Sequence, residues 1–175
     1  MSHRNIALMT KGHPFDRNAF FELFDGLPHV GYTHIEQPAA QLLFAPEHAR
    51  DYDAFVLYDM PGIAFHPDRA PDFAQPPASF KRNFGTLLES GFGMVFLHHA
   101  IAGWPAWEDY ARTIGGRFSY MPGSLNGVPV PDSGYRHSVT HQVRKLADHA
   151  VTAGVPDTFE ITDELYLYDV LEDTV

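Results

Sequence analysis

Short, almost wholly apolar runs that end at polar residues alternate with amphipathic stretches through the first two thirds of the chain. Runs of this kind are typical of strands buried on both faces of a parallel sheet, and helical spacing between them is typical of crossover helices. We expect strands over residues 6–10, 32–36, 53–58 and 93–97, the second being polar and near an edge. Helices are expected over 15–27, over 79–90 with Ser79 at the start, and from Pro105 to Gly115. This order predicts an α/β fold with a mostly parallel sheet.

Two segments have no periodic pattern and are expected to be loops. Residues 63–77 are a long loop of the kind that tends to be functional or mobile. Residues 117–135, at the start of the last third of the chain, are rich in Pro and Gly and are expected to form an extended loop. Alternation predicts a strand over 138–143 and two short strands, 159–161 and 165–167, around Thr162-Asp163-Glu164.

Length and charge limit the organisation and the partners. A chain of 175 residues with 45% hydrophobic residues suits one domain over residues 1–175, and a formal charge of -10 leaves little basic surface for nucleic acid. No stretch approaches the roughly 18 apolar residues of a membrane span, so no membrane partner is expected. The N-terminus has no signal-peptide core or cleavage site, which favours the cytoplasm.

Three predicted strands end at polar side chains, and the carboxyl ends of parallel strands are where ligands collect. His13 follows the first strand, Asp59 the third, and His98-His99 the fourth. Imidazole exchanges protons near neutral pH and a carboxylate accepts them, so His13, Asp59 and His98 are candidate catalytic residues. Asp59 precedes Met-Pro-Gly, and an ordinary turn residue is an equal alternative there.

His98 and His99 stand where a polar side chain first escapes the cost of burial in an apolar strand. Adjacent side chains of an extended segment point to opposite sides, so we expect one of the two to face a crevice. We take His98 as catalytic and His99 as substrate-binding. The alternative is that both are strand-end histidines bonded only to backbone.

Glu164 and Tyr166 occupy alternating positions on one face of a predicted strand, so both could enter one crevice. Glu164 is a candidate catalytic residue and Tyr166 a candidate substrate-binding residue, with a solvated acidic strand end as the competing explanation. Trp104, just outside a predicted helix, suits stacking on a sugar, whereas Trp107 lies on the buried stripe of that helix and is expected in the core.

His137 and His141 have the H-x-x-x-H spacing that suits a metal on a helix. In the strand predicted here they are separated by roughly 13 Å, so this pair alone cannot chelate. His141 is expected at the surface, and His137 remains a candidate for substrate binding. The chain has no Cys, which excludes thiolate zinc sites and a cysteine nucleophile. A histidine-carboxylate site for a divalent metal remains open, and its ligands are unknown from the sequence.

Several stretches taken together resemble the trehalose-utilisation (ThuA-like) family, which has the class I glutamine amidotransferase-like fold. They are Gly12-His13, residues 52–57, residues 91–100 with Leu97-His98-His99-Ala100, residues 107–118, and residues 148–156 leading to Thr162-Asp163-Glu164-Leu165-Tyr166. The resemblance implies a flavodoxin-like three-layer αβα sandwich. Family members usually continue past the last of these stretches into another strand and helix. We therefore expect either a shortened chain or a compact variant of the domain without this C-terminal segment.

The resemblance links the chain to disaccharide catabolism, particularly of 3-keto trehalose-type sugars. In amidotransferases the turn after the fourth strand holds a Cys nucleophile, and here His98 stands in the matching place. We therefore expect a carbohydrate-acting enzyme that uses histidine and carboxylate acid-base chemistry on a small-molecule sugar. A non-catalytic sugar-binding or regulatory module is the alternative, and a structural subunit of a homo-oligomer is a third.

Overall fold

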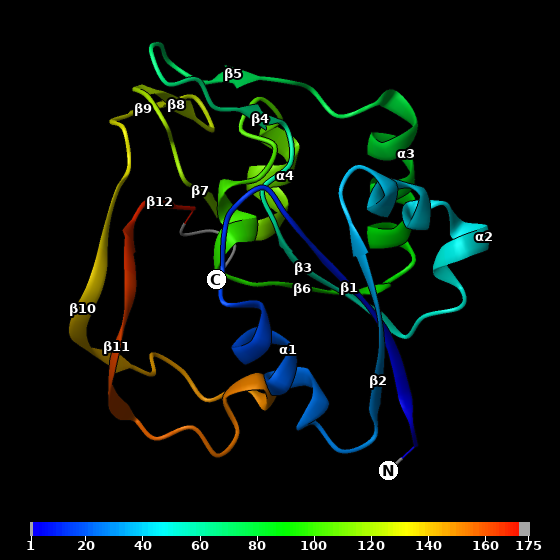
Figure 1. Cartoon of the computed structure of the whole chain (residues 1–175). Coiled ribbons are helices and arrows are strands. Elements are labelled where there is room, and N and C mark those ends of the chain that lie inside the picture. Colours follow the sequence, from blue (N-terminus) through cyan, green and yellow to red (C-terminus); the bar gives the residue numbers. More distant parts are fainter. Residues whose placement is uncertain (1, 172–175) are drawn as a thin grey trace.

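Four parallel strands form the central sheet of the computed structural model, which describes residues 2–171 (Figure 1). In the order β2-β1-β3-β6 along the sheet they are β2 (Val30–Glu36), β1 (Arg4–Lys11), β3 (Ala54–Asp59) and β6 (Gly93–Phe96). This is the 2-1-3-4 order of flavodoxin-like folds, and the predicted fold class is confirmed. The apolar runs of β1 and β3 are central and buried, while the more polar β2 lies at an edge, as expected.

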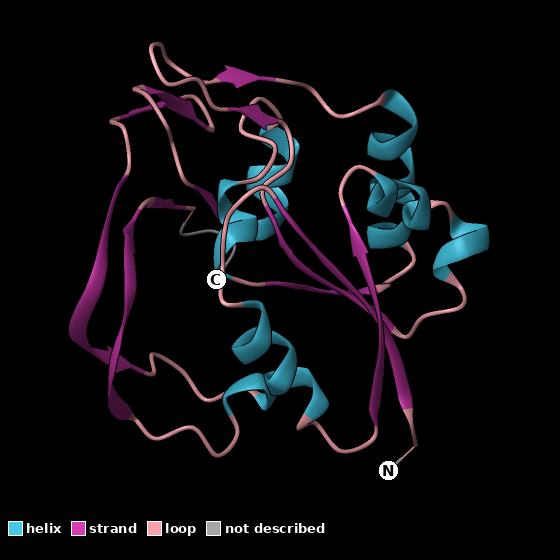
Figure 2. Ribbon diagram, in the orientation of Figure 1, coloured by secondary structure: helices cyan, strands magenta, loops and turns pink. Residues whose placement is uncertain are grey.

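Helices cover both faces of this sheet and complete three layers (Figure 2). On one face α1 (Arg17–Asp25) packs Phe24 against Ile6, Leu8 and Val56. On the other face the larger core is built by a 3₁₀ helix (Ala39–Phe44), α2 (Pro46–Ala49), α3 (Ala78–Glu89) and α4 (Glu108–Ile114). The Asp16 side chain caps α1 by accepting a hydrogen bond from the backbone N–H of Ala19.

Two helix starts differ from the expectation. Helix α3 begins at Ala78 with Pro77 as its N-cap residue, so Ser79 is already inside the helix. Pro105 does not open α4, which begins at Glu108 with Trp107 as its N-cap residue. The preceding Trp104 has a left-handed backbone and a side chain buried in the core, so the chain must turn before it can become helical. No helix in the described part is long and apolar enough to cross a membrane.

Beyond α4 the chain forms a long antiparallel hairpin. Strand β10 (Gly134–Arg144) pairs with β11 (Thr158–Leu167), which is one continuous strand where we expected two short ones. Val139 of β10 pairs with Asp163, and Thr140 pairs with Thr162. The residues expected to form a turn are therefore part of the strand. An irregularity between Arg136 and Val139 interrupts the register.

Each of the two segments expected to be loops contains a pair of short antiparallel strands. Residues 63–77 contain β4 (Ile63–Ala64) and β5 (Asp72–Phe73), and residues 117–135 contain β8 (Gly123–Leu125) and β9 (Val128–Val130). Strand β7 (Gly116–Arg117) pairs with β12 (Asp169–Val170), and 3₁₀ helices span His98–Ala102 and Ala150–Thr152. The pairing of β7 with β12 brings the chain after the hairpin back to the end of α4, so both ends of the hairpin segment are tied to the core.

Candidate functional site

Four of the predicted site residues meet where the sheet's carboxyl edge faces the hairpin. His13 follows β1, His98 and His99 follow β6, and Glu164 extends from β11. His98 Nε2 lies 2.8 Å from Glu164 Oε2, across 66 positions of sequence. Hairpin and sheet are therefore joined at this point by a direct polar contact.

The turn at His98-His99 is not extended, and the expectation that these side chains point to opposite sides is wrong. The chain passes from β6 directly into the 3₁₀ helix at His98, whose φ of 26° is left-handed. Successive side chains of a 3₁₀ helix are about 120° apart and do not alternate between opposite faces as in a strand. Both rings line the histidine-rich cavity described below, with centroids 5.0 Å apart.

His99 is the buried member of the cluster, with 3% of its surface exposed. Its ring lies between His13, at a centroid distance of 4.3 Å, and Tyr58, on which it stacks at 4.4 Å. Burial, with the neighbouring His13 and His98, lowers the pKa of His99 to about 4. The His99 ring is therefore neutral at neutral pH.

Glu164 lies against two imidazoles and accepts a hydrogen bond from one of them, that of His98. His98 approaches one carboxylate oxygen, and His137 Nδ1 lies 3.1 Å from the other, Oε1. Burial raises the pKa of Glu164, but the hydrogen bond from His98 and the electrostatic effect of His98 and His137 outweigh burial, so its pKa lies below the usual value. An ionised carboxylate only accepts hydrogen bonds, so Nε2 of His98, which faces it, carries the proton.

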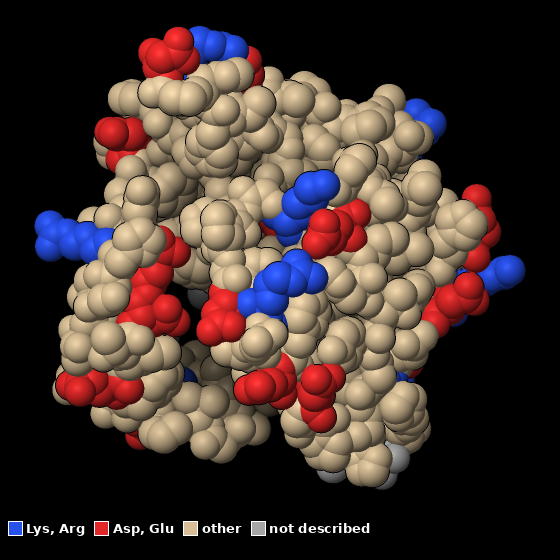
Figure 3. Space-filling view, in the orientation of Figure 1, with Lys and Arg blue, Asp and Glu red and all other residues tan. Residues whose placement is uncertain are grey.

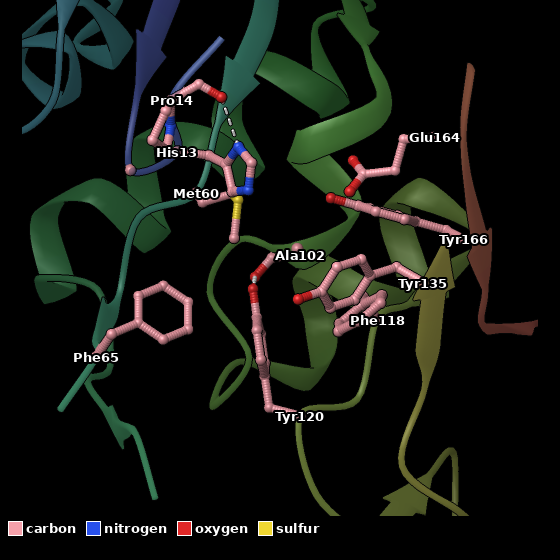
Figure 4. Close-up of a pocket in the computed structure, with 11 residues that line it drawn as sticks. His13, Pro14, Met60, Phe65, Ala102, Phe118, Tyr120, Tyr135, Glu164 and Tyr166 are labelled. Carbon is pink, nitrogen blue, oxygen red and sulfur yellow. Dashed lines mark hydrogen bonds between the residues drawn. The ribbon is translucent and has the colours of Figure 1, made fainter. Parts of the chain in front are cut away.

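His13 is oriented by its own loop. Its Nδ1 lies 2.7 Å from the carbonyl oxygen of Pro14, which can only accept, so Nδ1 carries a proton and Nε2 of the neutral ring has a free lone pair (Figure 4). The preceding Gly12 has a φ of 98°, and a Cβ there would lie 2.6 Å from the Met60 carbonyl oxygen. Only glycine fits this approach between the β1 and β3 ends.

Two adjoining cavities open on either side of His13 and Glu164. We call the first, of about 340 Å³, the aromatic cavity; it is lined by Gly12, His13, Pro14, Met60, Phe65, Ala102, Phe118, Tyr120, Tyr135, Glu164 and Tyr166. We call the second, of about 380 Å³, the histidine cavity; it is lined by His13, Pro14, Phe15, Asp16, Tyr58, His98, His99, His137, Asp163 and Glu164. The space-filling view shows the molecule hollowed between the hairpin and the rest of the protein, with acidic groups at the border (Figure 3).

Tyr166 lines the aromatic cavity and contacts His98 of the neighbouring histidine cavity. Its ring lies 4.1 Å from that of His98 and 5.0 Å from that of Phe118. In Figure 4 its hydroxyl points toward the Glu164 carboxylate, as alternation along β11 predicts for two side chains on one face. Burial and then the charge of Glu164 raise the pKa of Tyr166, so the phenol keeps its proton and remains a donor.

Asp59 is not part of this cluster, and the expectation that it opens into the crevice is wrong. Its side chain is fully buried beneath the strand ends and accepts a 2.6 Å hydrogen bond from Gln37 Nε2. It is the last residue of β3, where the side chain points inward, and the chain leaves the sheet only after it. Burial raises the pKa of Asp59 to about 6, and its Oδ1 has no partner among the described residues.

Trp104 also lies away from the cluster. It is 5% exposed and packs in the core 5.6 Å from Phe80, so it cannot serve as an open stacking platform. The reason is the left-handed turn at Trp104, which directs the indole toward Gly62 and α3. Trp107 is buried as expected.

His137 reaches the cluster through Glu164, whereas His141 bonds the backbone of Val139 and is half-buried. The residues that sequence reasoning missed are the aromatic walls Tyr58, Phe65, Phe118, Tyr120 and Tyr135. One signal could have found one of them, because Phe65 lies in the loop expected to be functional. Tyr135 lies directly opposite Tyr166 in the hairpin, but this register is visible only in the structure.

One group of side chains in the described residues could hold a metal ion. The ligand atoms of His98, His99 and Glu164 all lie within 4.8 Å of one another. Two imidazole nitrogens and a carboxylate oxygen are a donor set that divalent transition metals accept.

Comparisons with known proteins agree with this fold. A family model described as ThuA, trehalose utilisation, matches residues 29–175. A solved structure described as a putative ThuA-like protein from Parabacteroides merdae ATCC 43184 is similar, with a TM-score of 0.59 and 18% sequence identity. The match covers 94% of this chain and 63% of that chain, so this chain spans less than two thirds of its length. No curated protein matches the chain.

Proposed function

Because this chain belongs to the trehalose-utilisation (ThuA) family, we propose that it is a carbohydrate-acting enzyme of disaccharide catabolism whose substrate is a trehalose-type 3-keto sugar. The observation that carries the proposal is the meeting of His13, His98 and Glu164 between two adjoining cavities. Groups that exchange protons thereby border a space of the size that small ligands occupy. The absence of Cys excludes glutamine hydrolysis by a thiolate.

The aromatic cavity supports binding of a sugar ring. Its walls present Phe65, Phe118, Tyr120, Tyr135 and Tyr166, and aromatic rings stack on the apolar C–H face of a sugar. The phenol of Tyr166 and the carboxylate of Glu164 can donate to and accept from the sugar hydroxyls at the rim. The adjoining histidine cavity leaves room for the second ring of a disaccharide.

Two imidazoles supply the acid-base chemistry: that of His13, whose Nε2 is a base, and that of His98, which is hydrogen-bonded to Glu164. A ketone acidifies the neighbouring C–H, and His13 Nε2, with its free lone pair, is the group we assign to remove that proton. The electron pair then forms a carbon-carbon double bond while the glycosidic C–O bond breaks, and His13 returns the proton to the leaving oxygen. The His98–Glu164 pair faces the same space and would polarise the carbonyl or hydroxyl oxygen of the sugar.

Turnover of 3-keto-trehalose by the purified protein tests this proposal. Removing an acid-base group typically costs about 10²–10⁴-fold in rate, so His13→Gln should reduce kcat by at least about 100-fold. The control is His141→Ala, which changes a half-buried histidine of the hairpin that lies outside both cavities. Equal rates for the unmodified protein and His13→Gln would contradict the assignment of His13.

A non-catalytic sugar-binding or regulatory module is the second candidate, and the predominance of aromatic over charged residues in the aromatic cavity favours it. This candidate predicts saturable binding of the sugar without release of any product. Binding would then depend on Tyr166 and Phe118 and would survive His13→Gln. Calorimetric binding and product analysis on the same sample separate the two candidates.

A further inference from the structure

We propose that His98, His99 and Glu164 form a binding site for one divalent first-row transition-metal ion, with zinc as the reference metal. The use of this ion on a sugar rests on the proposed function, whereas its binding does not. The ion would replace the proton that His98 donates to Glu164.

The donor set fits the ion chemically. Sites with two His and one carboxylate leave at least one coordination position open for water or substrate. His98 Nε2 and Glu164 Oε2 are already 2.8 Å apart, and all three donors lie within 4.8 Å. Tetrahedral zinc with ligands at about 2.0–2.1 Å needs donor atoms about 3.3 Å apart, so closure requires shifts of about 1 Å.

The chain holds the three donors from different directions. The turn after β6 supplies two adjacent imidazoles because His98 and His99 are in a 3₁₀ helix and not in a strand. The hairpin supplies Glu164 from the opposite side. No local segment could offer this arrangement alone, which is why the sequence spacing gave no sign of it.

Neighbouring groups orient the donors as the outer shell of a metal site does. His137 holds Oε1 of Glu164 at 3.1 Å and so leaves Oε2 toward the two imidazoles. Tyr58 stacks on His99 and fixes its ring, and Tyr166 packs on His98 at 4.1 Å. Each proposed donor therefore has a partner that limits its rotation.

The charge around the site also favours a cation. The histidine cavity brings together the carboxylates of Asp16, Asp163 and Glu164, and none of the described residues that line either cavity is Lys or Arg. A contrasting group elsewhere is His66 with Asp72, where the guanidinium of Arg69 bonds both side chains and occupies the place of a cation. Among residues 2–171, no Lys or Arg forms an ion pair with Glu164, whose charged-atom contacts are with His98 and His137.

Calorimetric titration of the full chain, freed of metal by EDTA and dialysed, with Zn²⁺ tests the proposal. We expect one ion per chain with a dissociation constant in the micromolar range or tighter. Glu164→Gln and His98→Ala should each weaken binding by more than about 100-fold, while His141→Ala leaves it unchanged. Circular dichroism of each variant establishes that it is folded, and His99 is left intact because it is buried.

Titration with Co²⁺ supplies a second readout. Visible absorption bands of the bound ion should appear at one equivalent, have the intensity of a low-coordinate nitrogen and oxygen site, and vanish in Glu164→Gln. Absence of saturable binding, or binding that is equal in Glu164→Gln and the unmodified protein, would overturn the proposal.

The two proposals fail separately. Metal binding is measured without any sugar, and sugar turnover can be measured in EDTA. Zinc binding without turnover removes the proposed function and leaves the metal site, whereas turnover in EDTA without zinc binding does the reverse.

Discussion

The backbone at His98 has a φ of 26°, in the left-handed region that costs an L-residue roughly 1–2 kcal/mol. Strain of this kind persists where surrounding structure imposes it, and here it sets the ring toward Glu164. The side chain also contacts Tyr166 and His99. The position is thus costly for the fold and central to the candidate site.

Replacement of His98 by glycine should separate these two effects. His98→Gly and His98→Ala both lose the contact with Glu164, but glycine adopts a positive φ without steric cost. We expect His98→Gly to be more stable than His98→Ala by about 1 kcal/mol, measured by urea unfolding. An alanine variant as stable as the glycine variant would show that the backbone there is not strained.

Asp59 gives a pH dependence of stability that is independent of the site. Its pKa is about 6 in the folded protein against an ordinary 3.8, so the folded state binds the proton more tightly than the unfolded state. Stability should therefore fall as pH rises from about 4 to about 6 and be constant above, by up to about 3 kcal/mol from this group. Asp59→Asn, which can still accept from Gln37, should remove this fall.

Urea unfolding of the unmodified protein and Asp59→Asn at several pH values checks this prediction. The variant should be the more stable of the two at pH 7, and the difference should vanish near pH 4. A difference that stays constant over this range would mean that Asp59 ionises normally.

At the scale of elements, α3 contains a glycine that its packing does not need. A Cβ built at Gly85 meets nothing within 4 Å, and glycine inside a helix is less favourable than alanine by about 0.5–1 kcal/mol. Gly85→Ala should raise the free energy of unfolding by this amount. Gly12→Ala is the opposite case, since its Cβ would collide with the Met60 backbone, and it should destabilise the protein.

Strands β1 and β3 were predictable because buried strands have continuous apolar sequences, as these two do. Each of β1, β2, β3 and β6 lies within about two residues of its expected range. The hairpin was less predictable, because residues of β10 and β11 that pair are far apart in the sequence and most of their side chains are exposed. Their composition therefore hardly distinguishes a strand from a loop. The register between them depends on tertiary contacts that no local pattern contains.

The site was predictable only as a set of strand ends. Sheet topology brings His13 and His98 to one edge, which the strand pattern indicates. Asp59 points inward because it is still paired within the sheet, as the last residue of β3. The sequence does not show which residue is the last to be paired, so it does not show which side chains leave the sheet. Trp104 was predicted to stack on a sugar because its left-handed turn, which buries the indole, cannot be seen in the sequence.

Across the whole molecule, the cluster connects the sheet with the hairpin. Most hairpin side chains are exposed, and the His98–Glu164 contact is one of the interactions that hold it to the body. Zn²⁺ bound at His98, His99 and Glu164 would strengthen this link. Hydrogen exchange of β10 and β11 should then slow on addition of Zn²⁺, while exchange in α3 stays unchanged.

Glu164→Gln is the control for this experiment, and its hairpin should exchange at the same rate with and without Zn²⁺. Slowing that extends equally to α3, or slowing that persists in Glu164→Gln, would show that the ion acts elsewhere in the molecule.

Glucose release from 3-keto-trehalose should be measured in the unmodified protein and in Glu164→Gln, since both elimination and hydrolysis liberate the unoxidised ring. We expect release by the unmodified protein and a loss of about 100-fold or more in the variant, with His141→Ala unaffected. Release that is equal in all three proteins, or absent from the unmodified protein, would contradict it.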